Sequence, residues 1–156
     1  MVADMWETLL PVIVGGGIGL IGGLAGPPLS HILLRKAERK KLRREKFEQL
    51  LGLLYEHDHW LNLMRNIIVF GEEDTHPVEP LPKAKAIATM YFADLKQDLE
   101  TLDRATRSYK IWMHQAGLKR VSGSMTEISV GSEEAYGEFL AEFRKLTEKL
   151  EEYDYR

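Results

Sequence analysis

The chain of 156 residues contains no cysteine. This absence excludes disulfide bonds, thiolate metal sites and cysteine nucleophiles. Charge is absent from one part of the chain as well, because residues 8–34 include no Asp, Glu, Lys or Arg. The net charge of −3 at pH 7 therefore averages over segments of very different character.

The charge-free segment is long enough to cross a membrane. Its 27 residues would measure about 40 Å as a helix, whereas the hydrocarbon core of a bilayer is about 30 Å thick. Trp6 precedes the segment where an interfacial anchor is expected. Pro27 and Pro28 predict a kink, or a break with a new helix starting there. We expect residues 1–34 to form a single transmembrane segment.

This segment could instead be a cleavable signal peptide or a buried helix of a water-soluble protein. A cleavable signal peptide begins with basic residues, but here Asp4 and Glu7 precede the apolar run and the basic residues follow it. A buried helix of a water-soluble protein would carry six glycines between residues 15 and 23, each costing about 1 kcal/mol relative to alanine. Transmembrane helices contain glycine more often. A membrane span is favoured over both.

A basic collar, defined as residues 35–46, follows the span and contains eight Lys and Arg against two Glu. Basic residues beside a span stay in the cytoplasm, so we expect a single-pass protein of the cell inner membrane with its N-terminus outside. The residues expected to contact anionic lipid headgroups are Arg35, Lys36, Arg39, Lys40, Lys41, Arg43 and Arg44. They surround the helix without interleaved aromatic residues, a pattern that does not favour nucleic-acid binding.

The glycines of the span recur at helical spacing. The glycine face consists of Gly15, Gly19, Gly22, Gly23 and Gly26. Small residues on one helix face let two backbones approach closely in lipid, which predicts a homo-oligomer. The alternative is a flexible anchor without a fixed partner. If a ring of copies enclosed a lumen, it would be apolar and prone to dewetting.

Residues 47–156 are expected to form a small, all-α cytoplasmic bundle. Apolar residues at helical spacing predict helices over residues 47–68 and 84–116, and a third from Ser132, with Ser132 as its N-cap. An acidic, proline-rich loop is expected at residues 71–82, and Gly117 is expected to end the second helix. The second helix carries a heptad seam at Ala88, Leu95, Leu102, Tyr109 and Ala116, which Asp98 interrupts.

Residues 56–66 hold the polar side chains that suggest chemistry. His57 and His59 are about 200° apart on a helix, so they cannot share a metal ion, and no metal or cofactor site is expected. His57 is expected on the solvent-facing side. Asp58, Arg65 and Asn66 are expected to form either a surface pairing or a buried polar network.

Arg107 and His114, with six residues between them, are the candidate catalytic pair. An Arg followed by four to six residues and then a His is typical of helical RNA-cleaving domains and their inactive descendants. Together with the span, the collar and the small helical domain, it resembles the membrane-pore accessory proteins of RNA-targeting type VI CRISPR systems. The resemblance implies an oligomeric membrane effector that depolarises cells during antiviral defence, with the pair structural rather than catalytic.

The sequence therefore predicts a non-enzymatic, membrane-anchored homo-oligomeric effector that forms a pore or perturbs the membrane in bacterial antiviral defence. Its expected partners are membrane lipid and other copies of the chain. One alternative is a membrane-tethered adaptor that recruits a cytoplasmic protein through the seam or the loop at residues 71–82. Another is a helical ribonuclease that uses Arg107 and His114.

Overall fold

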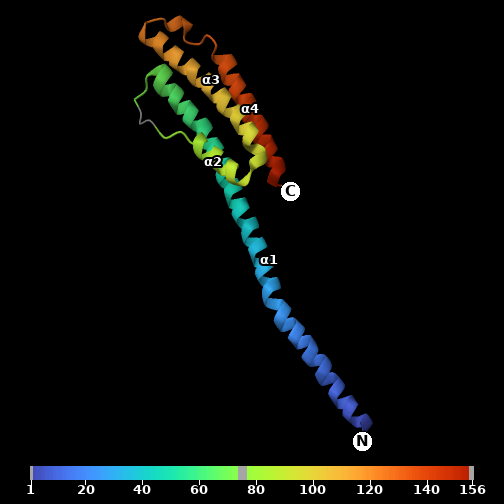
Figure 1. The fold of residues 1–156 in the computed structure, drawn as a ribbon. Coiled ribbons are helices and arrows are strands. Elements are labelled where there is room, and N and C mark those ends of the chain that lie inside the picture. Colours follow the sequence, from blue (N-terminus) through green and yellow to red (C-terminus); the bar gives the residue numbers. More distant parts are fainter. Residues whose placement is uncertain (1, 74–76, 155–156) are drawn as a thin grey trace. The chain divides into compact units, whose positions relative to one another are not determined.

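The computed structural model describes the backbone of residues 2–73 and 77–154 and the side chains of residues 34–73 and 77–152. Within those residues the chain is all-helical and contains no strand, which confirms the predicted fold class at that level. The elements in chain order are α1 (Val2–Arg65), the π-helix η1 (Asn66–Phe70), α2 (Leu81–Tyr91), the 3-10 helix η2 (Ala93–Leu95), α3 (Lys96–Val121), the 3-10 helix η3 (Met125–Glu127) and α4 (Ser132–Asp154) (Figure 1).

The chain divides into two compact units, Met1–Arg44 and Glu45–Arg156. The first unit is helical, and α1 runs through Pro27 and Pro28, so the predicted start of a new helix at these prolines is wrong. Among the side chains that the structure describes, no helix offers an apolar stretch long enough to cross a membrane. The predicted span (apart from Leu34) and the whole glycine face lie outside those residues.

The core of the second unit lies between residues 45–65 of α1 and helices α2, α3 and α4, and α3 and α4 run side by side (Figure 1). From α1 the fully buried side chains include Leu50, Leu54 and Leu61. These belong to the stripe predicted for residues 47–68. The stripe predicted on the last helix (Tyr136, Phe139, Phe143, Leu146 and Leu150) is buried except at Tyr136, which is half-buried.

The predicted continuous helix over residues 84–116 is wrong, because the chain turns at Phe92. The backbone of Phe92 leaves the helical region at φ −139° and ψ 61°, and its side chain is buried with its ring centroid 6.1 Å from that of Phe47. The heptad residues on both sides of the turn are nevertheless buried. Asp98, which interrupts the seam, lies 2.5 Å from the Lys149 ammonium of α4.

Gly117 does not end α3, which continues to Val121 before Gly123 adopts a φ of +83°. Gly117 is buried instead where α3 crosses η1, and a Cβ atom there would lie only 2.7 Å from the carbonyl oxygen of Ile68. The absence of a side chain thus allows two backbones to approach closely. The sequence signal was correct about a special glycine but wrong about its role.

Two other boundaries differ slightly from the predictions. Gly71 ends the first helical run as predicted, with a φ of +75°, but α2 begins within the predicted loop at Leu81, with Pro82 in its first turn. The helix α4 begins at Ser132, and the carbonyl of Gly131 accepts its first hydrogen bond, from the Ala135 amide at 3.1 Å. Gly131 rather than Ser132 therefore occupies the N-cap position.

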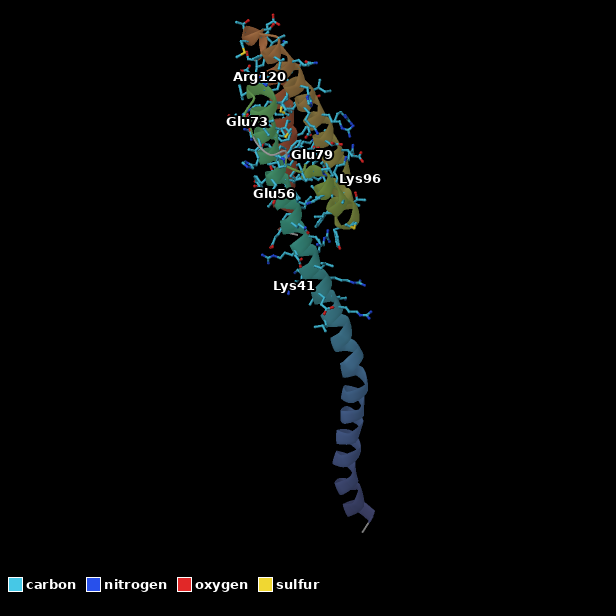
Figure 2. All side chains as sticks on the ribbon, turned by 90° about the vertical axis from the view of Figure 1, so that its left-hand side faces the viewer. Lys41, Glu56, Glu73, Glu79, Lys96 and Arg120 are labelled. Atoms are coloured by element: carbon cyan, nitrogen blue, oxygen red, sulfur yellow. The ribbon has the colours of Figure 1, made fainter. Side chains whose placement is uncertain are left out.

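Polar contacts hold residues 77–79 of the connector between η1 and α2 in place. The indole N–H of Trp60 donates to the Pro77 carbonyl at 2.8 Å. Lys110 of α3 pairs with Glu79 at 2.9 Å and lies over the Trp60 ring, 5.1 Å from its centroid. Figure 2 places Arg120 toward the end of the unit where η1 meets the connector, and its guanidinium covers Gly71.

Candidate functional site

The structure does not bring the predicted catalytic pair together. Arg107 is exposed on α3, and its guanidinium lies 2.6 Å from the carboxylate of Asp103, one turn earlier on the same helix. His114 is exposed two turns further along α3, about 10 Å away along the helix axis at 1.5 Å per residue. The structure thus pairs Arg107 with Asp103 and places His114 two turns further along α3.

Asp103 is the centre of a small charged cluster that includes Arg107. The Lys85 ammonium of α2 lies 2.8 Å from the same carboxylate oxygen that Arg107 contacts. Partial burial acts to raise the pKa of Asp103, but hydrogen bonds from Lys85 and Arg107 outweigh it and lower the pKa. The cluster thus joins α2 to α3, with one carboxylate shared between two cations.

His57 lies in the core rather than on the solvent-facing side of α1, so the predicted placement is wrong. Its side chain is fully buried, and its Nε2 atom lies 3.1 Å from the hydroxyl of Thr106 on α3. The imidazole stacks on Trp60 at 5.7 Å and meets the edge of Phe139 at 6.1 Å. Burial lowers the pKa of His57 to about 4, so the ring is neutral at pH 7.

His59 is exposed, so the two histidines face different environments, and within the described residues no cluster of His, Asp or Glu could hold a metal ion.

Arg65 lies at the end of α1 and turns toward α3. Its side chain is half-buried and forms a hydrogen bond with the Tyr109 hydroxyl. In the part of the chain that the structure describes, neither Nε of Arg65 nor Oδ1 of Asp58 has a hydrogen-bond partner, although both atoms are buried. Burial also raises the pKa of Asp58. Within the described residues, Asp58, Arg65 and Asn66 thus form neither the surface pairing nor the buried polar network that was predicted.

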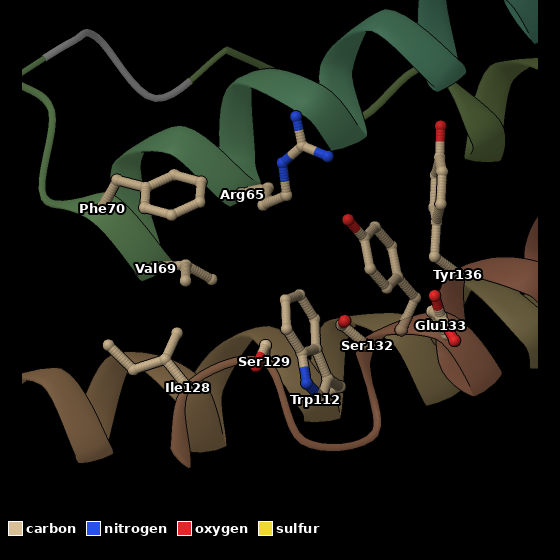
Figure 3. Close-up of a pocket in the computed structure, with 10 residues that line it drawn as sticks. Arg65, Val69, Phe70, Trp112, Ile128, Ser129, Ser132, Glu133 and Tyr136 are labelled. Carbon is tan, nitrogen blue, oxygen red and sulfur yellow. The ribbon is translucent and has the colours of Figure 1, made fainter. Parts of the chain in front are cut away.

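A cavity of about 450 Å³ opens beside Arg65. Its lining comes from α1 and η1 (Arg65, Val69, Phe70), from α3 (Tyr109, Trp112), and from the α3–α4 connection and α4 (Ile128, Ser129, Ser132, Glu133, Tyr136), as Figure 3 shows. The π-helix η1 widens the last turn of α1 at this place, and short π-helices are frequent at functional sites. The sequence carries no signal for the cavity, because the walls come from segments about 70 residues apart.

The aromatic wall of the cavity is held firmly in position. The Trp112 ring stacks on Tyr109 at 5.5 Å with an interplanar angle of 3°, and its indole N–H donates to the Val130 carbonyl at 3.0 Å. The Tyr136 ring lies 5.1 Å from Tyr109 on the adjacent side. Among the described residues, this cavity and the His57–Thr106 contact both place polar groups inside the second unit. No family model, curated protein or solved structure matches the chain.

Proposed function

We propose that this chain is a membrane-anchored, homo-oligomeric effector whose helical second unit lies in the cytoplasm. The observation that carries the proposal is the basic collar directly after a charge-free stretch of 27 residues. In the structure residues 34–45 are all exposed, and their side chains extend on opposite sides of the helix around Lys41 (Figure 2). An exposed cationic surface of this kind attracts anionic headgroups.

We further propose that the protein acts without chemistry of its own. The support is the geometry of α3, where Asp103 holds the Arg107 guanidinium and His114 lies two turns away. A membrane effector of this kind would work by assembling copies through the glycine face and perturbing the bilayer. The antiviral context remains an implication of the resemblance described above.

The test of this proposal is fractionation followed by mass measurement. The full-length protein should sediment with membranes after high-speed centrifugation and be released by detergent but not by high salt or carbonate. The detergent-solubilised particle should have a mass that corresponds to several copies of the 17.9 kDa chain. Expression should also depolarise cells, as reported by a voltage-sensitive dye. A protein that stays in the supernatant without detergent would contradict the membrane anchor.

The adaptor alternative cannot use the heptad seam, which is buried, but a different surface supports it. Several large apolar side chains are exposed near the α3–α4 connection of the second unit, namely Phe70, Leu118, Val121, Met125 and Val130, each between 59% and 78% exposed. Exposed apolar patches commonly mark protein-binding surfaces. The adaptor and the oligomeric effector predict different outcomes for two variants in cells. An adaptor loses its effect with Val121→Asp and keeps it with Gly19→Leu, whereas the oligomeric effector shows the reverse.

The ribonuclease alternative requires His114 and Arg107 to act together on RNA. Purified full-length protein should then cleave RNA, and His114→Ala should eliminate the cleavage. A protein without chemistry of its own would cleave no RNA in either form. Cleavage that disappears in the variant would show that the domain is an enzyme.

A further inference from the structure

The cavity beside Arg65 has walls that suit a flat, apolar molecule. Trp112 and Phe70 face it from α3 and η1, and Ile128 and Val69 complete the apolar surface (Figure 3). Its volume of about 450 Å³ lies within the range of small-molecule sites, roughly 300–1,000 Å³. Because Trp112 is fixed by its hydrogen bond to Val130 and its stacking on Tyr109, a ring could bind there with little loss of conformational freedom.

Arg65 supplies the one cation of the cavity. Its hydrogen bond to Tyr109 uses part of the guanidinium, and its buried Nε has no acceptor within the described residues. Nor does any carboxylate of that part of the chain form an ion pair with Arg65. A guanidinium is strongly suited to bind a carboxylate through two parallel hydrogen bonds. A carboxylate in the cavity would therefore bind the terminal guanidinium nitrogens of Arg65, because the buried Nε is not accessible from the cavity.

Acidic groups around the cavity limit the charge of that anion. Glu133 lines the cavity and Glu134 follows it in the first turn of α4. The unit as a whole is acidic, with 13 basic and 20 acidic residues after residue 46. A ligand with several negative charges, such as a nucleoside polyphosphate, would be repelled, whereas a single carboxylate directed at Arg65 would not.

We propose that this cavity is a binding site for a small aromatic monocarboxylate. The ring of the ligand lies against Trp112, and its carboxylate accepts hydrogen bonds from the Arg65 guanidinium. The site belongs entirely to the second unit, so the inference does not depend on the membrane anchor or on self-association.

The test uses 2-naphthoate as the probe and 2-naphthamide as its neutral counterpart. Full-length protein labelled with 5-fluorotryptophan gives three ¹⁹F resonances, one for each tryptophan, and Trp112→Phe assigns the resonance at the cavity. Only the Trp112 resonance should shift in a saturable way on titration with 2-naphthoate. The carboxylate should bind at least about 10-fold more tightly than the amide, because a hydrogen bond to a charged group adds that much affinity.

Arg65→Met should bring the affinity for the carboxylate down to that for the amide. The matched control Arg104→Met changes an exposed arginine of α3 and should keep the full preference. Equal affinities of carboxylate and amide in the unmodified protein would overturn the proposal, as would a Trp112 resonance that does not move. If circular dichroism shows that Arg65→Met does not fold, the affinities of the two probes for the unmodified protein still test the proposal.

Discussion

The imidazole of His57 lies 3.1 Å from the hydroxyl of Thr106, and both side chains are fully buried. The contact joins α1 to α3 across 49 residues of sequence. A buried polar pair of this kind fixes the register of two helices, because any shift would leave both groups without partners in the core. It also gives the second unit a built-in response to pH.

The stability of the second unit should fall as the pH decreases from 6.5 toward 4. His57 has a pKa of about 4 in the folded protein against 6.5 as the ordinary value. Between these values the unfolded chain takes up a proton that the folded chain does not, so unfolding becomes easier. The loss at pH 5 relative to pH 7 should be about 2 kcal/mol. The difference can be measured by thermal unfolding at the two pH values, monitored by circular dichroism.

His57→Gln should reduce this pH dependence, because an amide can still contact Thr106 but takes up no proton in this range. His59→Gln is the matched control, since His59 is exposed on the same helix, and it should leave the dependence intact. Asp58 acts in the opposite direction, because its raised pKa makes protonation favour the folded state. An unchanged pH dependence in His57→Gln would show that other groups cause it.

Substitutions at two helical glycines should change stability in opposite directions. Gly117→Ala should destabilise the second unit by about 1–3 kcal/mol, since its Cβ would lie 2.7 Å from the Ile68 carbonyl oxygen and force the backbones apart. Gly137→Ala in α4 meets nothing within 4 Å and should stabilise by about 0.5–1 kcal/mol through its helix propensity. Chemical unfolding of both variants provides the measurement. Similar stabilities would show that η1 and α3 can separate without cost.

Self-association should depend on one face of the membrane segment. Gly19→Leu should abolish the oligomer in detergent and the toxicity on overexpression, because a bulky side chain prevents close approach of two helices. Gly17→Leu introduces the same side chain about 200° around the helix and should leave the oligomer intact. Particle mass in detergent distinguishes the variants. If both retain the oligomer, the glycine face does not mediate assembly.

Orientation can be measured cleanly because the chain has no cysteine. In intact cells Ala3→Cys should react with a membrane-impermeant maleimide, whereas Glu151→Cys should react only after lysis. This follows from the retention of the basic collar on the cytoplasmic side. Replacement of the collar's Lys and Arg with Gln should weaken or randomise the orientation. Labelling of Glu151→Cys in intact cells would place the second unit outside.

The helical periodicity of the sequence predicted most of the buried positions but not where the helices end. The seam from Ala88 to Ala116 is buried, yet the helix that was expected to carry it turns at Phe92. Nothing local in the sequence marks this turn, because Phe92 is neither proline nor glycine. The side chain of Phe92 is buried between helices, and burial of a large aromatic group outweighs a few residues of helical hydrogen bonding.

The sequence by itself determined the all-α class, the buried stripes of α1 and α4, the glycine that ends η1, and the contrast between a charge-free segment and its basic collar. These follow from local periodicity and composition, which act over a few turns of helix. Only the tertiary structure decided that His57 is buried against Thr106, that Gly117 lets two backbones approach closely rather than ending a helix, and that Arg65 faces a cavity. Each of these depends on residues distant in sequence, and the burial that decides them exists only once the helices have packed.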